Sequence, residues 1–400
     1  MTGVGVPMAI RWGSSDPAAP LIVLLQGFSA PGEATEKDLA AFAPCLPVGA
    51  GYASVRVPRP PSEQGFASFR EWLDDQAAPQ VPVVLVGFGS GAAFAGGLLL
   101  AEPARFAAAG LLCGTLPFDA GVPVTRGRLV GVPVFLTHGV RDTVIPVELQ
   151  RRTWNYLVRE SGSPLWAQRA PTGHELTAKM VSELGGWIEA RLGYLQQHAV
   201  PAGGRAADQT CWPTLPDGLL PLRAGDSPEV SVTTPQQQES QNAPLELQEA
   251  LFSRISTLDG VVTGPSAVSV PGARAFLLPP SRLPSSRLTP GHGSEAEQPS
   301  EAFIVSELGE FAHLHPGYDG SMHLVLPIPL AHDVVIKGWG VAHPLAGIRL
   351  TPGMVMIFGP RNPAELNIVT AIARASHSHA ARSTTRGHGA PFRGSYDATL

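Results

Sequence analysis

The chain has 400 residues, of which 44% are hydrophobic, and a formal net charge of −5. This length favours two domains, the hydrophobic content is ample for buried cores, and the small negative charge gives no electrostatic reason to expect nucleic acid as a partner. No apolar stretch reaches the ~18 residues of a membrane span, and the N-terminus lacks a signal-peptide pattern. The three cysteines match no metal-binding or CxxC spacing. We therefore expect a cytoplasmic protein without a transmembrane segment.

Residues 1–196 alternate apolar runs with helical patterns. The runs predict buried strands at 21–25, 53–57, 81–86, 108–113 and 132–136, and the stretches between them predict helices at 35–43, 66–74, 91–101 and 147–160. Continuous apolar strands that are separated by helices are typical of a parallel sheet covered on both faces. We therefore expect an α/β domain with a mostly parallel sheet.

Residues 197–244 differ in composition, because proline, glycine and glutamine are frequent and no periodicity remains. This composition predicts a flexible linker. A second unit over 245–380 begins with Leu247, Leu251 and Ile255 at helical spacing. Its apolar patterns predict strands at 268–270, 303–305, 322–326 and 354–358 and helices at 330–336 and 364–375. We expect a separate small α+β domain, followed by a disordered tail over 381–400.

The segment Gly87-Phe88-Gly89-Ser90-Gly91 follows a predicted buried strand and opens a predicted helix. In an α/β-hydrolase this position carries Gly-x-Ser-x-Gly, because the nucleophile sits on a strained turn that only small neighbours permit. Here Gly89 occupies the nucleophile position by motif, and Ser90 follows one residue late. Two hypotheses stay open: a rearranged elbow presents Ser90 as the nucleophile, or the fold is non-catalytic and serves binding.

Three further segments extend this pattern. They are a strand that ends in Gln26-Gly27-Phe28, a strand and loop over 137–146 that contain Asp142, and a turn over 172–175 that contains His174. With the elbow, they make residues 18–193 resemble the phospholipase/carboxylesterase family of α/β-hydrolases. The order nucleophile, acid, base agrees with that fold, and Gln26 stands where the family has a histidine.

The resemblance implies acyl-enzyme chemistry on a carboxylic ester. Asp142 would orient the imidazole of His174, which would take a proton from the hydroxyl of Ser90. Backbone N–H groups of Phe28 and Gly91 would form the oxyanion hole. Because both residues stand at strand ends, which meet at the C-terminal edge of a parallel sheet, we also predict that Asp142 and His174 lie within hydrogen-bonding reach and face the elbow.

A second resemblance covers residues 301–380. The matching stretches are 310–316, 319–327, 337–340 and 343–345. They resemble the luciferase-like domain, which is found alone or fused behind hydrolases. The family name does not by itself imply light emission, and the resemblance assigns no mechanism.

Histidines are the chemical feature of this second unit. His313 and His315 alternate on one face of a predicted strand, a turn leads to His323 on the next strand, and His343 follows later. These imidazoles could bind zinc or another borderline metal, or they could be hydrogen-bonded surface or half-buried side chains. An acid–base site of His323 with Asp319 is a third possibility.

The strand register decides between these alternatives. Opposed residues of an antiparallel hairpin share a face, so a one-residue slip would separate His323 from the first pair. We expect all three to share a face and to point outward, because Met322, Leu324 and Leu326 form an apolar set that should pack inward.

The combined prediction is a carboxylic-ester hydrolase with an altered elbow, fused to a luciferase-like domain. Its substrate would be a small-molecule ester or lipid, no cofactor is predicted, and the oligomeric state stays open. The alternatives are a pseudoenzyme that acts in binding or as a scaffold, and an activity or metal site that resides in the C-terminal domain.

Overall fold

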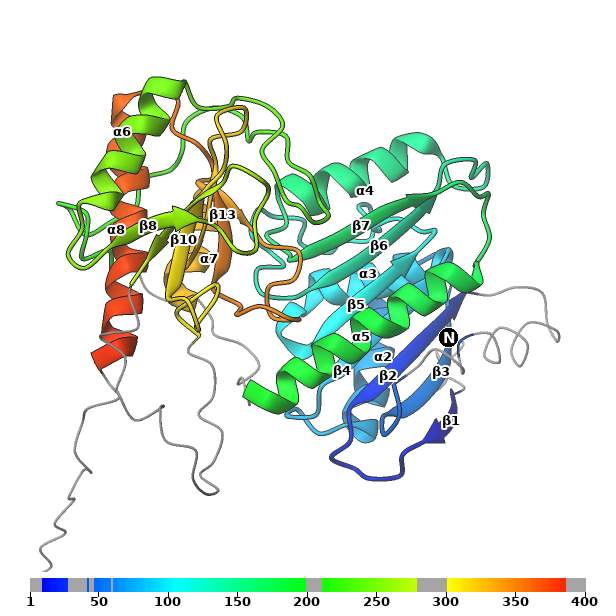
Figure 1. The fold of residues 1–400 in the computed structure, drawn as a ribbon. Helices are drawn as coiled ribbons and strands as arrows, with labels where there is room; N and C mark the ends of the chain where they lie inside the picture. The colour runs from blue at the N-terminus through cyan, green and yellow to red at the C-terminus, as the bar shows by residue number, and fades with distance from the viewer. Residues whose placement is uncertain are drawn as a thin grey trace, which may run out of the picture.

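A computed structural model describes residues 9–27, 42, 47–58, 60–198, 211–278 and 301–385. The chain forms two domains, which Figure 1 shows beside one another. The N-terminal domain contains, in chain order, β1 (Ala9–Gly13), β2 (Leu21–Gly27), β3 (Gly51–Val57), α2 (Glu63–Gln76), β4 (Val83–Phe88), α3 (Ser90–Ala101), the 3-10 helix η2 (Pro103–Arg105), β5 (Ala108–Leu112), β6 (Val134–Gly139), α4 (Val147–Arg159), β7 (Leu165–Ala170) and α5 (Ala178–His198). The C-terminal domain contains α6 (Leu245–Ser256), β8 (Val262–Pro265), β9 (Arg274–Leu277), β10 (Glu310–Leu314), β11 (Met322–Val325), α7 (Ile328–Ile336), β12 (Gly340–Ala342), β13 (Met354–Ile357) and α8 (Pro363–Thr385).

A seven-stranded sheet forms the centre of the N-terminal domain, in the order β1-β3-β2-β4-β5-β6-β7. Edge strand β1 runs antiparallel to β3, and the other pairings are parallel. Helices α2, α3 and α4 pack on one face, where Phe66, Phe94 and Leu157 join one buried cluster. Helix α5 covers the other face with Leu184 and Ile188. The predicted α/β architecture is therefore confirmed; the helix expected at 35–43 lies almost wholly outside the described residues.

The C-terminal domain is built on a six-stranded antiparallel sheet, in the order β12-β13-β11-β10-β9-β8. Helices α6 and α8 lie side by side against this sheet (Figure 1) and contribute Leu251, Ile255 and Ile372 to one core with Phe276 and Leu324. This arrangement confirms the predicted small α+β domain.

Three expectations for the C-terminal half differ clearly from the observed elements. Residues 268–270 form a bend and not a strand, because Pro271-Gly272 follows and Val268 is exposed. The strand in this region is β8, which ends at Pro265. Residues 303–305 contribute only the isolated bridge of Val305 with Glu310. Helix α8 continues to Thr385, past the expected start of the tail at 381.

The segment 211–244 differs from the flexible linker that its composition predicts. Trp212 is fully buried in the C-terminal core, where its Nε1 donates to Asp333 Oδ2 at 2.7 Å. Further along, Gln238 is buried because its amide is fully engaged: Nε2 donates to the carbonyl of Ser240 at 2.9 Å, and Oε1 accepts from the N–H of Gly359 at 2.9 Å. The segment is thus an irregular but packed part of the C-terminal domain.

Contacts between the two domains include charged side chains, one loop and apolar packing of Val130 against the C-terminal core. The buried guanidinium of Arg191 on α5 donates to the carbonyl of Gly347, and Arg159 pairs with Glu229 at 2.9 Å. Ile348 is buried in the cluster that α5 forms with the N-terminal sheet. Among the helices of the described residues, none is both long and apolar enough to cross a membrane.

Trp212→Ala should lower the unfolding free energy of the C-terminal domain by about 3–5 kcal/mol, because it leaves a cavity in a closed core. Urea unfolding monitored by circular dichroism measures the change. Leu222→Ala is the matched control in the same segment, since Leu222 is 74% exposed and its loss should cost less than about 0.5 kcal/mol. Equal effects of the two substitutions would contradict the packing of this segment.

Candidate active site and histidine cluster

Gly89 forms the turn between β4 and α3 with φ +55° and ψ −115°. This left-handed backbone is easily adopted by glycine and strains other residues. A Cβ built on Gly89 would lie 3.2 Å from His174 Nε2. The residue that faces the histidine is therefore the one in the nucleophile position of the motif, and it carries no side chain.

The two flanking glycines are required by close backbone contacts. A Cβ on Gly87 would lie 2.3 Å from the carbonyl carbon of Gly91, and a Cβ on Gly91 would lie 1.9 Å from the carbonyl oxygen of Leu25. Neither distance is possible for real atoms, so α3 can approach β2 and β4 only with glycine at both positions. The steric pattern of a nucleophile elbow is thus complete.

Ser90 is the first residue of α3 and is partly buried. Because Gly89 has a left-handed backbone and Ser90 is already helical, the side chain of Ser90 leaves the backbone in a different direction from a Cβ on Gly89. The first helical hydrogen bond runs from Ala93 N–H to the Gly89 carbonyl at 3.2 Å. The first turn of α3 therefore lies at the positive end of the helix dipole. Phe28, the other predicted oxyanion-hole residue, lies outside the described residues.

Asp142 and His174 meet as the sequence predicts. Asp142 lies in the turn after β6 and His174 in the turn after β7, and His174 Nδ1 donates to Asp142 Oδ2 at 2.8 Å. Asp142 Oδ1 accepts from the N–H groups of Val144 at 2.9 Å and Ile145 at 3.0 Å. This leaves His174 Nε2 directed at the elbow, and the ring of Phe88 lies beside it with centroids 4.9 Å apart.

Electrostatics keep the carboxylate of this pair ionised. Burial would raise the pKa of Asp142, but the hydrogen bonds from Ile145, His174 and Val144 outweigh it and lower that pKa below its ordinary value. The anion therefore fixes the tautomer of His174. Nearby, burial raises the pKa of the Cys113 thiol to about 11, which keeps it protonated and makes it a poor nucleophile.

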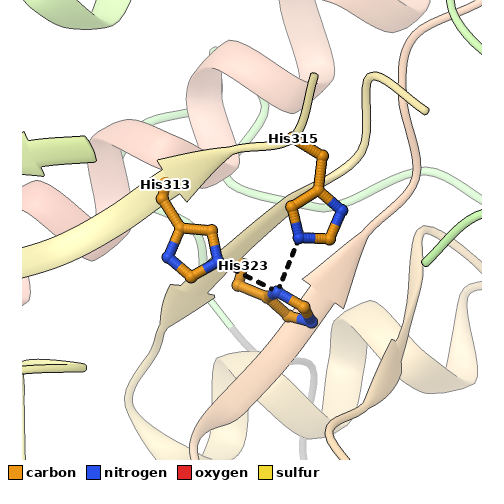
Figure 2. Close-up of side chains that lie close together, drawn as sticks. All are labelled: His313, His315 and His323. Atoms are coloured by element: carbon orange, nitrogen blue, oxygen red, sulfur yellow. Dashed lines mark hydrogen bonds between the residues drawn. The ribbon is translucent and has the colours of Figure 1, made fainter. Parts of the chain in front are cut away.

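The predicted histidine register is confirmed. His313 on β10 lies directly opposite His323 on β11, and His315 follows at the end of β10. Nε2 of His313 lies 3.2 Å from Nδ1 of His323, and Nε2 of His315 lies 3.1 Å from the same atom. Figure 2 shows these two contacts converging on His323.

His323 lies on the face of β11 opposite the core residues Met322 and Leu324, as predicted, but this face is covered and the three rings are buried. His313 and His315 are 2% exposed and His323 is 4% exposed. They are covered because Gln236, from the segment 211–244, reaches the outer side of His323. Sequence analysis missed this residue, since a glutamine in a polar stretch gives no signal of burial.

Each of the three rings is held by a hydrogen bond from the nitrogen that points away from the cluster. His313 Nδ1 donates to Glu310 Oε1 at 2.8 Å, and His315 Nδ1 donates to Asp319 Oδ2 at 2.6 Å. His323 Nε2 donates to Gln236 Oε1 at 3.0 Å. The amide nitrogen of Gln236 donates to the carbonyl of Ala342 at 3.2 Å, which orients its oxygen toward His323.

His343 and Asp319 have other roles than the sequence analysis considered. The group of converging nitrogens consists of His313, His315 and His323. His343 stands beside it, with its ring 5.2 Å from that of His323, but its Nδ1 accepts from the N–H of Leu345 at 3.1 Å. Asp319 binds His315 and Ser321, and not His323 as an acid–base pair would require.

Burial keeps the inner rings neutral. Burial lowers the pKa of His313, and it lowers the pKa of His323 well below the ordinary value. The neighbouring histidines lower both pKa values further. The hydrogen bond that His313 donates to Glu310, together with the charge of that carboxylate, opposes the pKa shift of His313 without cancelling it. Neutral imidazoles with one bare nitrogen each are the form in which histidine binds metals.

These features define an α/β domain with a nucleophile-elbow turn, joined to a second domain with a buried histidine cluster. The Phospholipase/Carboxylesterase family profile matches residues 68–191, and the Luciferase domain profile matches residues 308–376. A luciferase of Armillaria mellea is 30% identical over 192 residues, which cover 45% of this chain and 67% of that protein. A luciferase of Neonothopanus nambi is 29% identical over 168 residues, covering 39% of this chain and 59% of that protein. Through its C-terminal half, the chain belongs to the luciferase family.

Solved structures similar to the N-terminal half include two ester-cleaving enzymes. The Bacillus cereus carboxylesterase is 20% identical, with a TM-score of 0.38, and the match covers 46% of this chain and 94% of that one. Acyl-protein thioesterase 2 of Zea mays is 18% identical, with a TM-score of 0.37, covering 46% of this chain and 98% of that one.

Gly91→Ala should destabilise the N-terminal domain by about 3 kcal/mol, because the new methyl group overlaps the Leu25 carbonyl. Gly186→Ala is the control: Gly186 is exposed within α5, nothing lies within 4 Å of its Cβ position, and the substitution should stabilise by about 0.5–1 kcal/mol. Thermal unfolding of both variants measures this. A Gly91→Ala protein as stable as its parent would disprove the tight crossing at the elbow.

Proposed function

We propose that the N-terminal domain hydrolyses carboxylic esters, with the Asp142–His174 pair as general base and water as the attacking nucleophile. One observation carries this proposal: a Cβ on Gly89 would lie 3.2 Å from His174 Nε2. The base therefore faces the position from which a serine hydroxyl would attack, and a water molecule in front of Gly89 can take that place. The match to the Phospholipase/Carboxylesterase family supports an ester as the substrate class.

The reaction follows from the contacts of the pair. His174 Nε2 takes a proton from water as the water oxygen bonds to the ester carbonyl carbon, and Asp142 stabilises the imidazolium. The positive N-terminal end of α3 stabilises the developing oxyanion. When the bond to the alcohol breaks, the imidazolium returns its proton to the leaving oxygen. Acid and alcohol are released without an acyl-enzyme.

This chemistry should be slow compared with that of a complete triad. A triad without its nucleophile keeps on the order of 10³–10⁴-fold acceleration over water, from binding and oxyanion stabilisation. Two competing assignments use the same residues. In the first, Ser90 acts as the nucleophile after a rearrangement of the elbow. In the second, the domain binds its ligand without turnover; this assignment is favoured by the missing nucleophile side chain at Gly89.

Hydrolysis of a short-chain aryl ester by five proteins separates these assignments. The parent should turn over slowly, Ser90→Ala should retain that rate, and His174→Ala should lose about 100-fold. Gly89→Ser restores Gly-x-Ser-x-Gly and should raise the rate by about 100-fold or more, because the loss of a triad serine costs on the order of a million-fold. Gly89→Ala is the matched control, with the same backbone strain and no hydroxyl, and should not exceed the parent.

A fluorophosphonate probe supplies the second readout, since it labels activated serines. We expect labelling of Gly89→Ser and none of the parent. If the parent is labelled and Ser90→Ala is inactive, Ser90 is the nucleophile and the water mechanism is wrong. If the parent and His174→Ala hydrolyse the ester at equal rates, the domain is a binding module.

A further inference from the structure

The histidine cluster places three bare nitrogens face to face. Glu310, Asp319 and Gln236 each accept a hydrogen bond from the outer nitrogen of one ring, so the inner nitrogen of each ring carries a lone pair. Two such lone pairs approach Nδ1 of His323 to 3.1 and 3.2 Å. Lone pairs repel one another at these distances. A cation at the centre of the three nitrogens would accept one lone pair from each and form three coordinate bonds in place of this repulsion.

The charge of the cluster points in the same direction. The carboxylates of Glu310 and Asp319 are both fully buried. Within the described part of the chain, each contacts the ring of a histidine, His313 or His315, and neither pairs with lysine or arginine. Buried carboxylates need compensating partners, and a cation bound to the rings beside them would supply positive charge where lysine and arginine supply none.

We propose that His313 Nε2, His315 Nε2 and His323 Nδ1 bind one divalent transition-metal ion of the zinc class, with Glu310, Asp319 and Gln236 as outer residues that orient the ligands. Metal–nitrogen bonds of about 2.1 Å place neighbouring ligand atoms roughly 3.0–3.4 Å apart, and the two short separations at His323 fit this range. Imidazole ligands favour zinc, iron, cobalt, nickel or copper over magnesium and calcium.

The outer residues are themselves held in place, as a built metal site requires. Ser266 Oγ donates to Glu310 Oε1 at 2.8 Å, and the N–H of Ser321 donates to Asp319 Oδ1 at 3.0 Å. Gln236 is buried, and both ends of its amide are engaged. Three protein ligands leave a coordination position for water or a substrate, which distinguishes this arrangement from a closed, four-ligand structural site. The proposal does not depend on the activity of the N-terminal domain.

The first measurement is the metal content of the full-length protein, purified without a metal-affinity tag and analysed by inductively coupled plasma mass spectrometry. The protein is then stripped with a chelator and titrated with cobalt(II), whose visible absorption reports nitrogen ligation. We expect one cobalt ion per chain, with restored thermal stability on binding. Stripped protein that takes up no cobalt overturns the proposal, and the rings are then joined by shared protons.

Variants locate the site. His323→Ala should abolish the cobalt absorption, whereas His377→Ala, whose ring on α8 binds the carbonyl of Asp259, should match the parent. Gln236→Ala keeps all three ligands and loses one orienting contact, so cobalt should bind about 10–100-fold more weakly. This variant also tests the proposal if His323→Ala fails to fold. Cobalt that binds His323→Ala or Gln236→Ala with parental affinity is held elsewhere, and the proposal is then wrong.

Discussion

The N-terminal domain depends on one steric constraint, the contact of Gly91 with the carbonyl of Leu25. No β-carbon fits there, and the same holds for Gly87 against Gly91. This crossing sets the start of α3, the left-handed backbone of Gly89 and the direction in which a side chain at position 89 would point. The constraint acts on the flanking positions and not on the central one. The fold can therefore lose the nucleophile side chain and keep every other part of the elbow.

In both candidate sites, one ring nitrogen of each histidine donates a hydrogen bond that fixes the ring, and the other nitrogen is left for chemistry. At the elbow, Asp142 holds a single ring, and the second nitrogen of His174 faces the turn. In the C-terminal domain the same device occurs three times, and the free nitrogens face one another. One imidazole directed at a turn is suited to moving a proton, whereas three that converge are suited to holding a cation. Geometry alone separates the two kinds of chemistry.

The sequence predicted the N-terminal domain well, because its buried strands are uniformly apolar and because Asp142 and His174 both follow strand ends. It left Gly89 and Ser90 undecided, since the direction of a side chain depends on backbone angles that a motif does not contain. The register of His313 and His323 also followed from strand geometry. Their burial did not, because the residue that covers them lies 87 positions before His323 in the chain. Glutamines such as Gln236 look like linker residues until their amide partners are known.

The position of Gln236 also limits where a gene fusion can join this domain to another protein. The family match begins at residue 308, yet the core and the histidine cluster draw on Trp212, Gln236 and helix α6, all upstream of it. A gene fusion or recombination event that joined a new partner at residue 308 would separate the histidines from their cover and from part of their core. Exchange of the partner without this damage requires a junction before Trp212. In this chain, that junction lies in the short stretch that follows α5.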